Sequence, residues 1–184
     1  MIENNTIENS GNNSGGGSIH LDGFMGDGTC NTTIPYFVDL SEIGQPPPGN
    51  NPTPVTVKGN SITNTPGWGI TLNAAGACID NNTINSAGSG MNIYGPGYSN
   101  SQSNNNKISN NVITSAGNNG IVLAGSGNTI DSNTVTNTGG QGFYFNSQSQ
   151  NNIITNNEYF KIFMSSIFLP IQINKKLLDK VHKA

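Results

Sequence analysis

Apolar residues recur along the chain in short alternations with polar ones. The repeated pattern is an aliphatic residue, two variable positions, Asn, one variable position and a second apolar residue, as in Ile79-Asp-Asn-Asn82-Thr-Ile84. Alternation over a few residues is typical of half-buried β-strands. Copies of this anchor begin at Ile2, Val57, Ile79, Ile108, Ile130 and Ile154. Their starts lie 55, 22, 29, 22 and 24 residues apart, which indicates a period near 22 residues.

A second strand-like element follows most anchors after six or seven residues. It reads Gly69-Ile-Thr-Leu72, Gly90-Met-Asn-Ile93, Gly120-Ile-Val-Leu123 and Gly142-Phe-Tyr-Phe145, with Ser18-Ile-His-Leu21 in the first copy. No unit contains a stretch of helical periodicity long enough for an α-solenoid. A unit this short cannot bury its own apolar face, so it must stack on its neighbours. We therefore predict an all-β solenoid with inward aliphatic rows and with the recurring Asn at one corner, where stacked amides hydrogen-bond from coil to coil.

These repeats resemble the right-handed parallel β-helix family, the pectate-lyase-like superfold. The resemblance covers residues 1–157 and implies a single-stranded right-handed parallel β-helix of about five to six coils. The Asn/Gly-rich composition stops near Asn157, so residues 158–184 are expected to be an atypical C-terminal cap or tail, with a short C-terminal helix as one form. Met1 opens inside a repeat, and we expect further β-helix coils or a partner beyond the N-terminus.

Composition narrows the classes of partner. Charged residues make up 9% of the chain, with 7 Lys, no Arg and a formal charge of -3. Nucleic acid is not expected as a partner, because binding it needs clustered cations. The apolar stretch 159–173 contains a Lys and a Pro and is too short for a membrane span.

The chain has two cysteines, Cys30 and Cys78. A disulfide between them would suit an oxidising compartment, and two buried free thiols are the alternative. With the β-helix resemblance, this leads us to expect an extracellular or cell-surface protein, with the periplasm as an alternative.

Two insertions, 22–54 and 94–107, leave the predicted helix at the same edge. Insertions in solenoids often lie on the binding face, and the resemblance implies that carbohydrate sites lie over the strand they flank. The outward residues of that strand are predicted to be His20, Thr71, Asn92, Val122 and Tyr144. This face is our candidate groove, and the alternative is that neither insertion has a role in binding.

A polysaccharide is the expected partner of this groove. Tyr94, Tyr98 and Tyr144 offer apolar ring faces with hydroxyl edges, on which sugar rings can stack. Thr71 and Asn92 would add polar contacts. The alternative is that Tyr94 and Tyr98 pack their own loop.

His20, Asp22 and Asp27 form the densest group of titratable residues in the sequence. A His beside carboxylates is a candidate acid/base or metal-binding group, and the alternative is a glycine-rich turn with surface acids. Calcium at Asp22 and Asp27 stays an alternative, because their spacing matches neither an EF-hand loop nor the glycine-rich calcium nonapeptide. No other cofactor is expected.

Catalysis is not the favoured interpretation. Lyases of the resembling fold use Arg or Lys as the base, whereas the repeats contain no Arg and only Lys58 and Lys107, beside anchors. Glycoside hydrolysis needs two carboxylates close together, and Asp80 and Asp131 follow equivalent anchors two coils apart, away from the candidate face.

The favoured function is therefore polysaccharide binding. One alternative is a non-catalytic structural or adhesive stalk, and another is a fragment of a polysaccharide lyase, hydrolase or epimerase centred on His20 and Asp22. A loose Thr-x-Thr array on a second face also leaves ice binding open.

Overall fold

The structure, a computed structural model, describes residues 1–10, 17–25, 55–93, 103–146, 149–159, 162–164 and 172–173. Of 22–25, 162–164 and 172–173 it describes the backbone only. Every regular element in this part of the chain is a β-strand. The helix expected within 174–184 lies outside the described residues.

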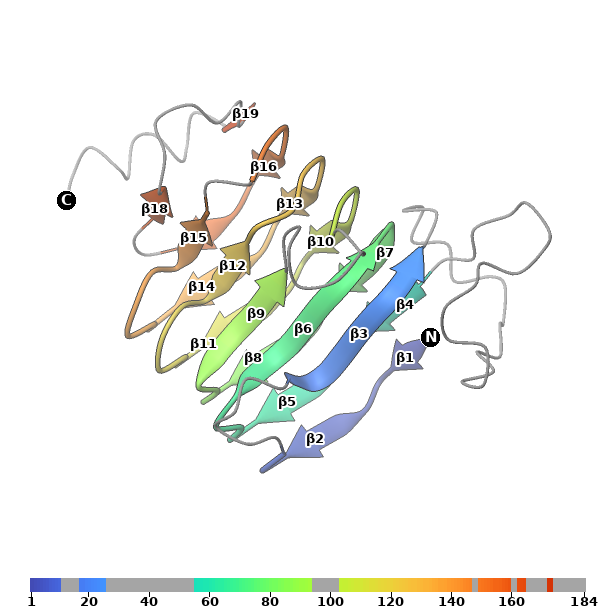
Figure 1. Ribbon diagram of the computed structural model, residues 1–184. Helices are drawn as coiled ribbons and strands as arrows, with labels where there is room; N and C mark the ends of the chain where they lie inside the picture. Colours follow the sequence, from blue (N-terminus) through green and yellow to red (C-terminus); the bar gives the residue numbers. More distant parts are fainter. Residues whose placement is uncertain are drawn as a thin grey trace, which may run out of the picture.

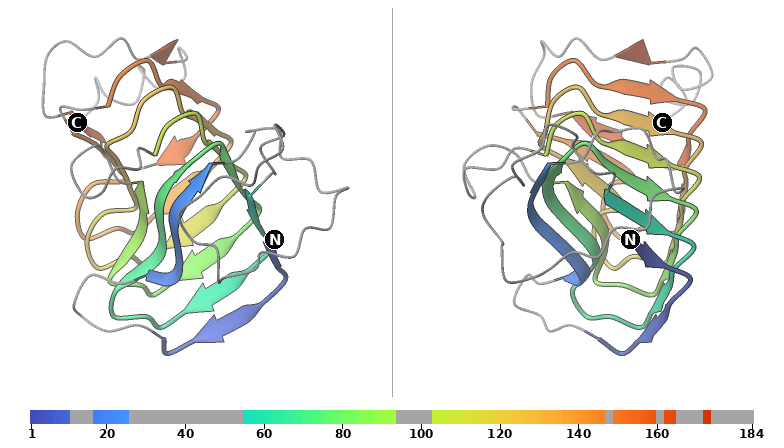
Figure 2. Two further views of the ribbon diagram at one scale, coloured as in Figure 1. Left: turned by 45° about the vertical axis from the view of Figure 1, so that its right-hand side comes forward. Right: turned by 90° about the vertical axis from the view of Figure 1, so that its right-hand side faces the viewer.

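The strands form three sheets, which we call A, B and C, and all neighbouring strands run parallel. Each coil gives one strand to each sheet in the order A, B, C, so neighbours within a sheet are three strands apart along the chain. Figures 1 and 2 show the coils stacked along one axis, from the N-terminal coil in blue to the C-terminal coil in orange. This is the parallel β-helix that the repeats predict.

The strand bounds follow the repeat. Sheet A contains β1 (Ile2–Glu3), β4 (Val55–Lys58), β7 (Ala77–Asp80), β10 (Lys107–Ser109), β13 (Thr129–Asp131), β16 (Ile153–Thr155) and β19 (Gln172–Ile173). Sheet B contains β2 (Thr6–Glu8), β5 (Ser61–Thr63), β8 (Thr83–Asn85), β11 (Val112–Thr114), β14 (Thr134–Thr136) and β17 (Glu158–Tyr159). Sheet C contains β3 (Gly17–Met25), β6 (Trp68–Ala75), β9 (Ser89–Ile93), β12 (Ile121–Leu123), β15 (Phe143–Phe145) and β18 (Ile162–Met164). Strands of all three sheets thus continue beyond Asn157.

The core consists of straight rows of apolar side chains, because neighbouring strands pair in register at the inward positions. In sheet A the row runs through Val57, Ile79, Ile108, Ile130 and Ile154, all of them buried. Towards the C-terminal end the rows become aromatic, and the rings of Phe143 and Tyr159 meet edge to face at 4.9 Å. Burial raises the pKa of Tyr159 to about 12. The predicted aliphatic rows are confirmed.

The turns explain the abundance of Asn, Ser and Gly. Backbone φ is positive at one position before each corner Asn, at one position after most strands of sheet B, and at one position before several strands of sheet A. Only Gly, and to a lesser degree short polar residues such as Asn, adopt this conformation without a large cost. Residues with positive φ in the corner column are Asn4, Gly59, Asn81, Asn110, Ser132 and Asn156.

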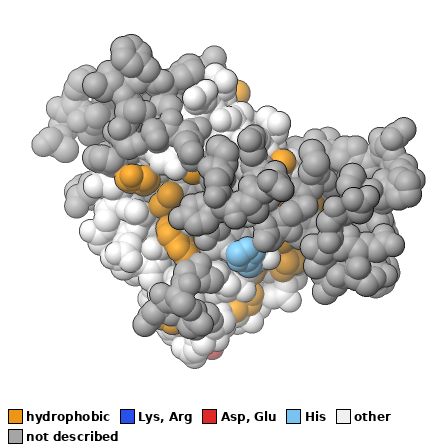
Figure 3. Space-filling view, in the orientation of Figure 1, with side chains coloured by type: hydrophobic (Ala, Val, Ile, Leu, Met, Phe, Trp, Pro, Cys, Tyr) orange, Lys and Arg blue, Asp and Glu red, His pale blue; other side chains and the backbone are white. Residues whose placement is uncertain are grey.

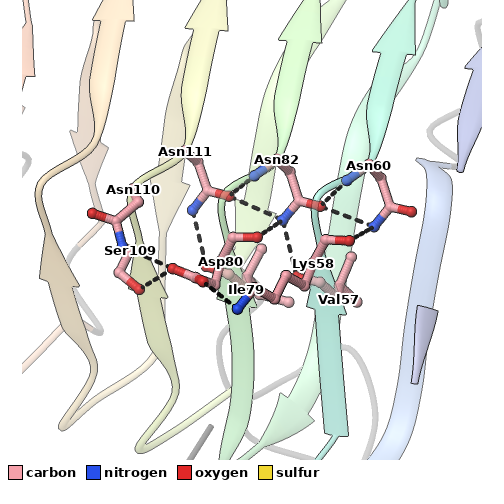
Figure 4. A network of polar contacts seen from close by, with 9 residues as sticks. All are labelled: Val57, Lys58, Asn60, Ile79, Asp80, Asn82, Ser109, Asn110 and Asn111. Atoms are coloured by element: carbon pink, nitrogen blue, oxygen red, sulfur yellow. Dashed lines mark hydrogen bonds and ion pairs between the residues drawn. The ribbon is translucent and has the colours of Figure 1, made fainter. Parts of the chain in front are cut away.

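The corner asparagines form the predicted amide ladder, part of which is drawn in Figure 4. The backbone N and the Nδ2 of Asn82 both donate to Oδ1 of Asn111, at 2.9 and 3.0 Å, and Asn111 repeats the arrangement with Asn133. The ladder runs through Asn5, Asn60, Asn82, Asn111, Asn133 and Asn157. A second, shorter ladder that the sequence analysis missed joins Asn106, Asn128 and Asn152 just before sheet A.

Candidate functional site

The outward residues of sheet C form a single row along the helix axis. Strand pairing places His20 beside Thr71, Thr71 beside Asn92, Asn92 beside Val122 and Val122 beside Tyr144. This is the row that the repeats predict. His20 is exposed, while Asn92, Val122 and Tyr144 are half-buried.

Thr71 lies in this row, but its side chain is 0% exposed. Its Oγ1 has no hydrogen-bond partner among the described residues. A Cβ placed on Gly17 would lie 2.9 Å from this oxygen, so the backbone of β3 passes close to the Thr71 side chain. A ligand over the row would therefore contact His20 and Asn92, with Thr71 beneath the surface.

Both insertions adjoin this sheet, because 26–54 follows β3 and 94–102 follows β9. Between these two strands lies β6, whose register with β3 extends to Met25 opposite Ala75. Figure 3 looks onto sheet C, and the described side chains in this view are mostly uncharged, with hydrophobic patches among polar atoms. Among the described side chains in this view, none is coloured as Lys or Arg.

Several predicted site residues cannot be placed against this row. Asp27, Cys30, Tyr94 and Tyr98 lie outside the described residues. Asp22 lies on β3 opposite Asn73, with its backbone alone described. Within the described part of the chain, no group of three His, Cys, Asp or Glu could hold a metal ion. The acid/base role of His20 and Asp22 and the calcium role of Asp22 and Asp27 stay hypotheses.

Two carboxylates do occupy well-defined positions, but on sheet A, and Figure 4 draws the first of them, Asp80. Oδ1 of Asp80 accepts hydrogen bonds from Ser109 Oγ at 2.9 Å and from Asn110 Nδ2 at 2.8 Å, both from the next coil. Its Oδ2 lies 3.5 Å from Lys58 Nζ. These contacts join three successive coils.

Asp131 repeats the arrangement two coils further on. Its Oδ1 accepts from Thr155 Oγ1 at 2.6 Å and from Asn156 Nδ2 at 2.9 Å, and Ser132 Oγ donates to its Oδ2 at 3.1 Å. The sequence signal for this motif is an Asp directly after an anchor Ile, followed one coil later by Ser or Thr and then Asn.

The environment of both carboxyl groups favours the ionised form. Burial raises the pKa of Asp80, but hydrogen bonds from Asn110 and Ser109 and the charge of Lys58 outweigh it, so the pKa lies below its ordinary value. For Asp131, too, burial raises the pKa, and its hydrogen bonds together with the charge of Lys107 bring it below the ordinary value. Groups with such lowered pKa values are poor general acids near neutral pH. We interpret both carboxylates as structural groups whose hydrogen bonds hold neighbouring coils together.

A shallow open hollow lies along the turns that follow sheet B. It is lined by Asn64, Thr65, Pro66, Ser86, Ala87, Gly88, Ser115 and Gly117. These are turn residues of successive coils, where Ala and Gly leave little side-chain volume. The hollow therefore follows this turn column and does not lie over the row of sheet C.

Cys78 lies on β7, is 2% exposed and is disulfide-bonded. Its strand neighbours at the same position are Thr56 and Lys107. In the part of the chain that the structure describes, no helix is long and apolar enough to cross a bilayer.

Comparison with known protein families shows to which family the chain belongs. Residues 49–169, about two thirds of the chain, match the family model described as right handed beta helix region. The match begins before β4 and runs past Asn157. No curated protein and no solved structure matches the chain.

Proposed function

The chain belongs to the right-handed β-helix family, and from this premise we propose that it is a secreted or cell-surface module that binds a polysaccharide along sheet C. The observation that supports this most is the in-register row in which His20, Asn92 and Tyr144 follow one another along the helix axis. The row is linear and has one outward position in each coil. A polysaccharide is also linear and has one sugar in each repeat, so the two can run side by side.

The chemistry of the row suits a sugar polymer. Histidine and asparagine side chains both donate and accept hydrogen bonds, as sugar hydroxyls do. The ring of Tyr144 adds an apolar face with a polar edge. Neighbouring strands lie about 4.8 Å apart, so a chain running along the axis would meet the outward side chains of successive coils, except at the buried Thr71. Several weak contacts to one polymer then add up through effective concentration.

The insertions support the choice of this face over the other two. They adjoin β3 and β9, on either side of β6, and insertions of solenoids often form the walls of a binding face. We assign Tyr94 and Tyr98, which belong to the second insertion, to the same site. The disulfide of Cys78 supports an oxidising compartment and hence the proposed location.

The test is retention of the purified chain in native gels that contain soluble polysaccharides. We expect wild-type protein to be retarded by at least one polymer. Loss of one side-chain hydrogen bond in His20→Ala or Asn92→Ala should weaken retention about fivefold, the equivalent of about 1 kcal/mol. Tyr144→Ala should weaken it further through lost stacking.

The matched controls are Thr83→Ala and Thr134→Ala, which change outward positions of sheet B without touching sheet C. Both should bind like the wild type. Equal losses in the two sets of variants would contradict a site on sheet C. Absence of retention by every polymer would contradict the proposed function as a whole.

A structural or adhesive stalk is the second candidate. The observation that favours it is that the hollow along the turn column lies away from sheet C, while ladders and core rows run without a break from coil to coil. A chain that binds no polysaccharide yet keeps its cooperative fold would favour this function.

A further inference from the structure

We infer that the site on sheet C takes a neutral polysaccharide and discriminates against polyuronates. This inference rests on the proposed function, and it concerns the class of polymer. It follows from where the positive charges of the chain lie, from what the flanking segments contain, and from the chemistry of the row itself.

The described row contains no Lys or Arg. The chain has no Arg, and its Lys residues before the C-terminal segment 158–184 are Lys58 and Lys107. Both belong to sheet A, at the end of β4 and at the start of β10. A carboxylate on each sugar of a bound chain would therefore find no Lys or Arg along the described part of sheet C, where His20 is the one side chain that can become cationic.

Each of these two lysines already has a carboxylate nearby. Lys58 Nζ lies 3.5 Å from Asp80 Oδ2. The charge of Lys107 is felt at Asp131, where it helps to lower the pKa. Lys58 is thus paired with a carboxylate, and Lys107, on sheet A, does not belong to the row.

The insertions can add only negative charge. Segment 22–54 contains Asp22, Asp27, Asp39 and Glu42 with no Lys or Arg, and 94–106 contains no charged residue. Like charges near a binding face raise the free energy of the complex and slow association. A polyuronate therefore meets a face whose two flanking segments are neutral or acidic in sequence.

The cost of binding the wrong polymer follows from desolvation. A carboxylate that loses water without a partner costs several kcal/mol, whereas the hydroxyls of a neutral sugar can pair with the imidazole of His20 and the amide of Asn92. Bound neutral polymer would also be insensitive to salt, since screening acts on charges.

The experiment uses the full chain and matched polymer pairs that differ in charge alone. The pairs are cellulose-type β-glucan and its C6-carboxylated derivative, and β-1,4-mannan and β-1,4-polymannuronate. Only retention that Tyr144→Ala reduces is assigned to the site. His20→Asn is included because it removes the one side chain of the row that can become cationic.

We expect the site to bind a neutral member about tenfold or more tightly than its uronate partner, a difference of about 1.4 kcal/mol. This preference should persist in His20→Asn, in the presence of calcium or a chelator, and between low salt and about 0.15 M salt. Tyr144-dependent binding of a polyuronate as tight as that of its neutral partner, with or without calcium, would overturn the inference and leave the proposed function standing. Binding of no polymer at all would overturn both.

Discussion

The buried asparagine column allows a sharp test of what holds the coils together. Asn111 is 0% exposed. Its Oδ1 accepts two hydrogen bonds from Asn82, and its Nδ2 donates to the carbonyl oxygen of Ile79 and to Oδ1 of Asn133, both at 2.9 Å. Asn111→Ala removes all four bonds without changing the backbone turn.

The magnitude depends on which groups lose their last partner. Nδ2 of Asn82 keeps two carbonyl acceptors, and Oδ1 of Asn133 keeps the backbone N of Asn111 as a donor. The backbone N–H of Asn82 loses its acceptor, whereas the carbonyl of Ile79 loses one donor but stays within the paired strands β7 and β10. One unsatisfied buried group costs about 1–3 kcal/mol and the other lost hydrogen bonds add about 1 kcal/mol, so we expect a loss of about 2–4 kcal/mol. That is a large share of the roughly 5–15 kcal/mol by which a domain is stable.

The control comes from the same column. Asn5 is exposed, and its side chain donates a single bond, to Oδ1 of Asn60 at 2.9 Å. We expect Asn5→Ala to cost about 1 kcal/mol or less. Asn111→Asp keeps the acceptor but turns the donor towards Ile79 and Asn133 into a second oxygen, so it should be at least as harmful as Asn111→Ala.

The assay is urea unfolding followed by circular dichroism and by the fluorescence of Trp68, the chain's one tryptophan. Each coil interacts mainly with its neighbours. Loss of the Asn111 contacts can therefore make the coils before and after Asn111 unfold at different urea concentrations, so that circular dichroism and Trp68 fluorescence report different transitions. A free energy of unfolding for Asn111→Ala within about 1 kcal/mol of that for Asn5→Ala would refute the reasoning from unsatisfied groups.

Three further predictions concern charges, cysteines and glycines. The pKa values of Asp80 and Asp131 lie below the ordinary 3.8, so their ionised forms stabilise the fold above that pH. This contribution is lost as the pH falls through the lowered pKa values. The urea midpoint should therefore drop in that pH window, and it should drop less in the double Asp→Asn variant. Because Cys78 is disulfide-bonded and the chain contains 2 Cys, the unfolded, unreduced chain should show no reactive thiol, and a free thiol before reduction would argue against the bond. A Cβ at Gly120 would lie 2.5 Å from a carbonyl oxygen of the next coil, whereas the nearest atom to a Cβ at Gly117 is 3.4 Å away. In urea unfolding, Gly120→Ala should therefore lower the free energy of unfolding by about 1–3 kcal/mol more than Gly117→Ala does. Equal losses would contradict this packing.

The sequence was sufficient to predict the fold because each repeat position has the same environment in every coil. An inward Ile such as Ile79 and a corner residue such as Asn82 recur at a fixed spacing, so one pattern specifies a whole row. The predicted row of sheet C followed from the same logic. Positions that recur are the positions that a single sequence reveals.

What the sequence did not reveal depends on neighbours from other coils. Thr71 is buried although it lies in the outward row, and its side chain is approached by the backbone at Gly17, which belongs to the preceding coil and lies outside the repeat pattern. The hydrogen bonds of the Asp80 carboxylate come from Ser109 and Asn110 of the next coil. This pattern can be recognised in the sequence only when the two coils are aligned without the insertion 94–107. Contacts of this kind are set by register, which insertions of unequal length obscure.

The fold separates stability from recognition, and this bears on how the site can be tested. Core rows and ladders use inward and corner positions, such as Ile79 and Asn111, which are 0% exposed. His20 and Asn92 occupy outward positions between buried neighbours on the same strand. Exposed positions away from such networks usually change stability by no more than about 0.5 kcal/mol. A substitution in the outward row that abolishes retention at an unchanged unfolding midpoint therefore reports lost recognition, whereas a loss that accompanies a lower midpoint reports a damaged coil.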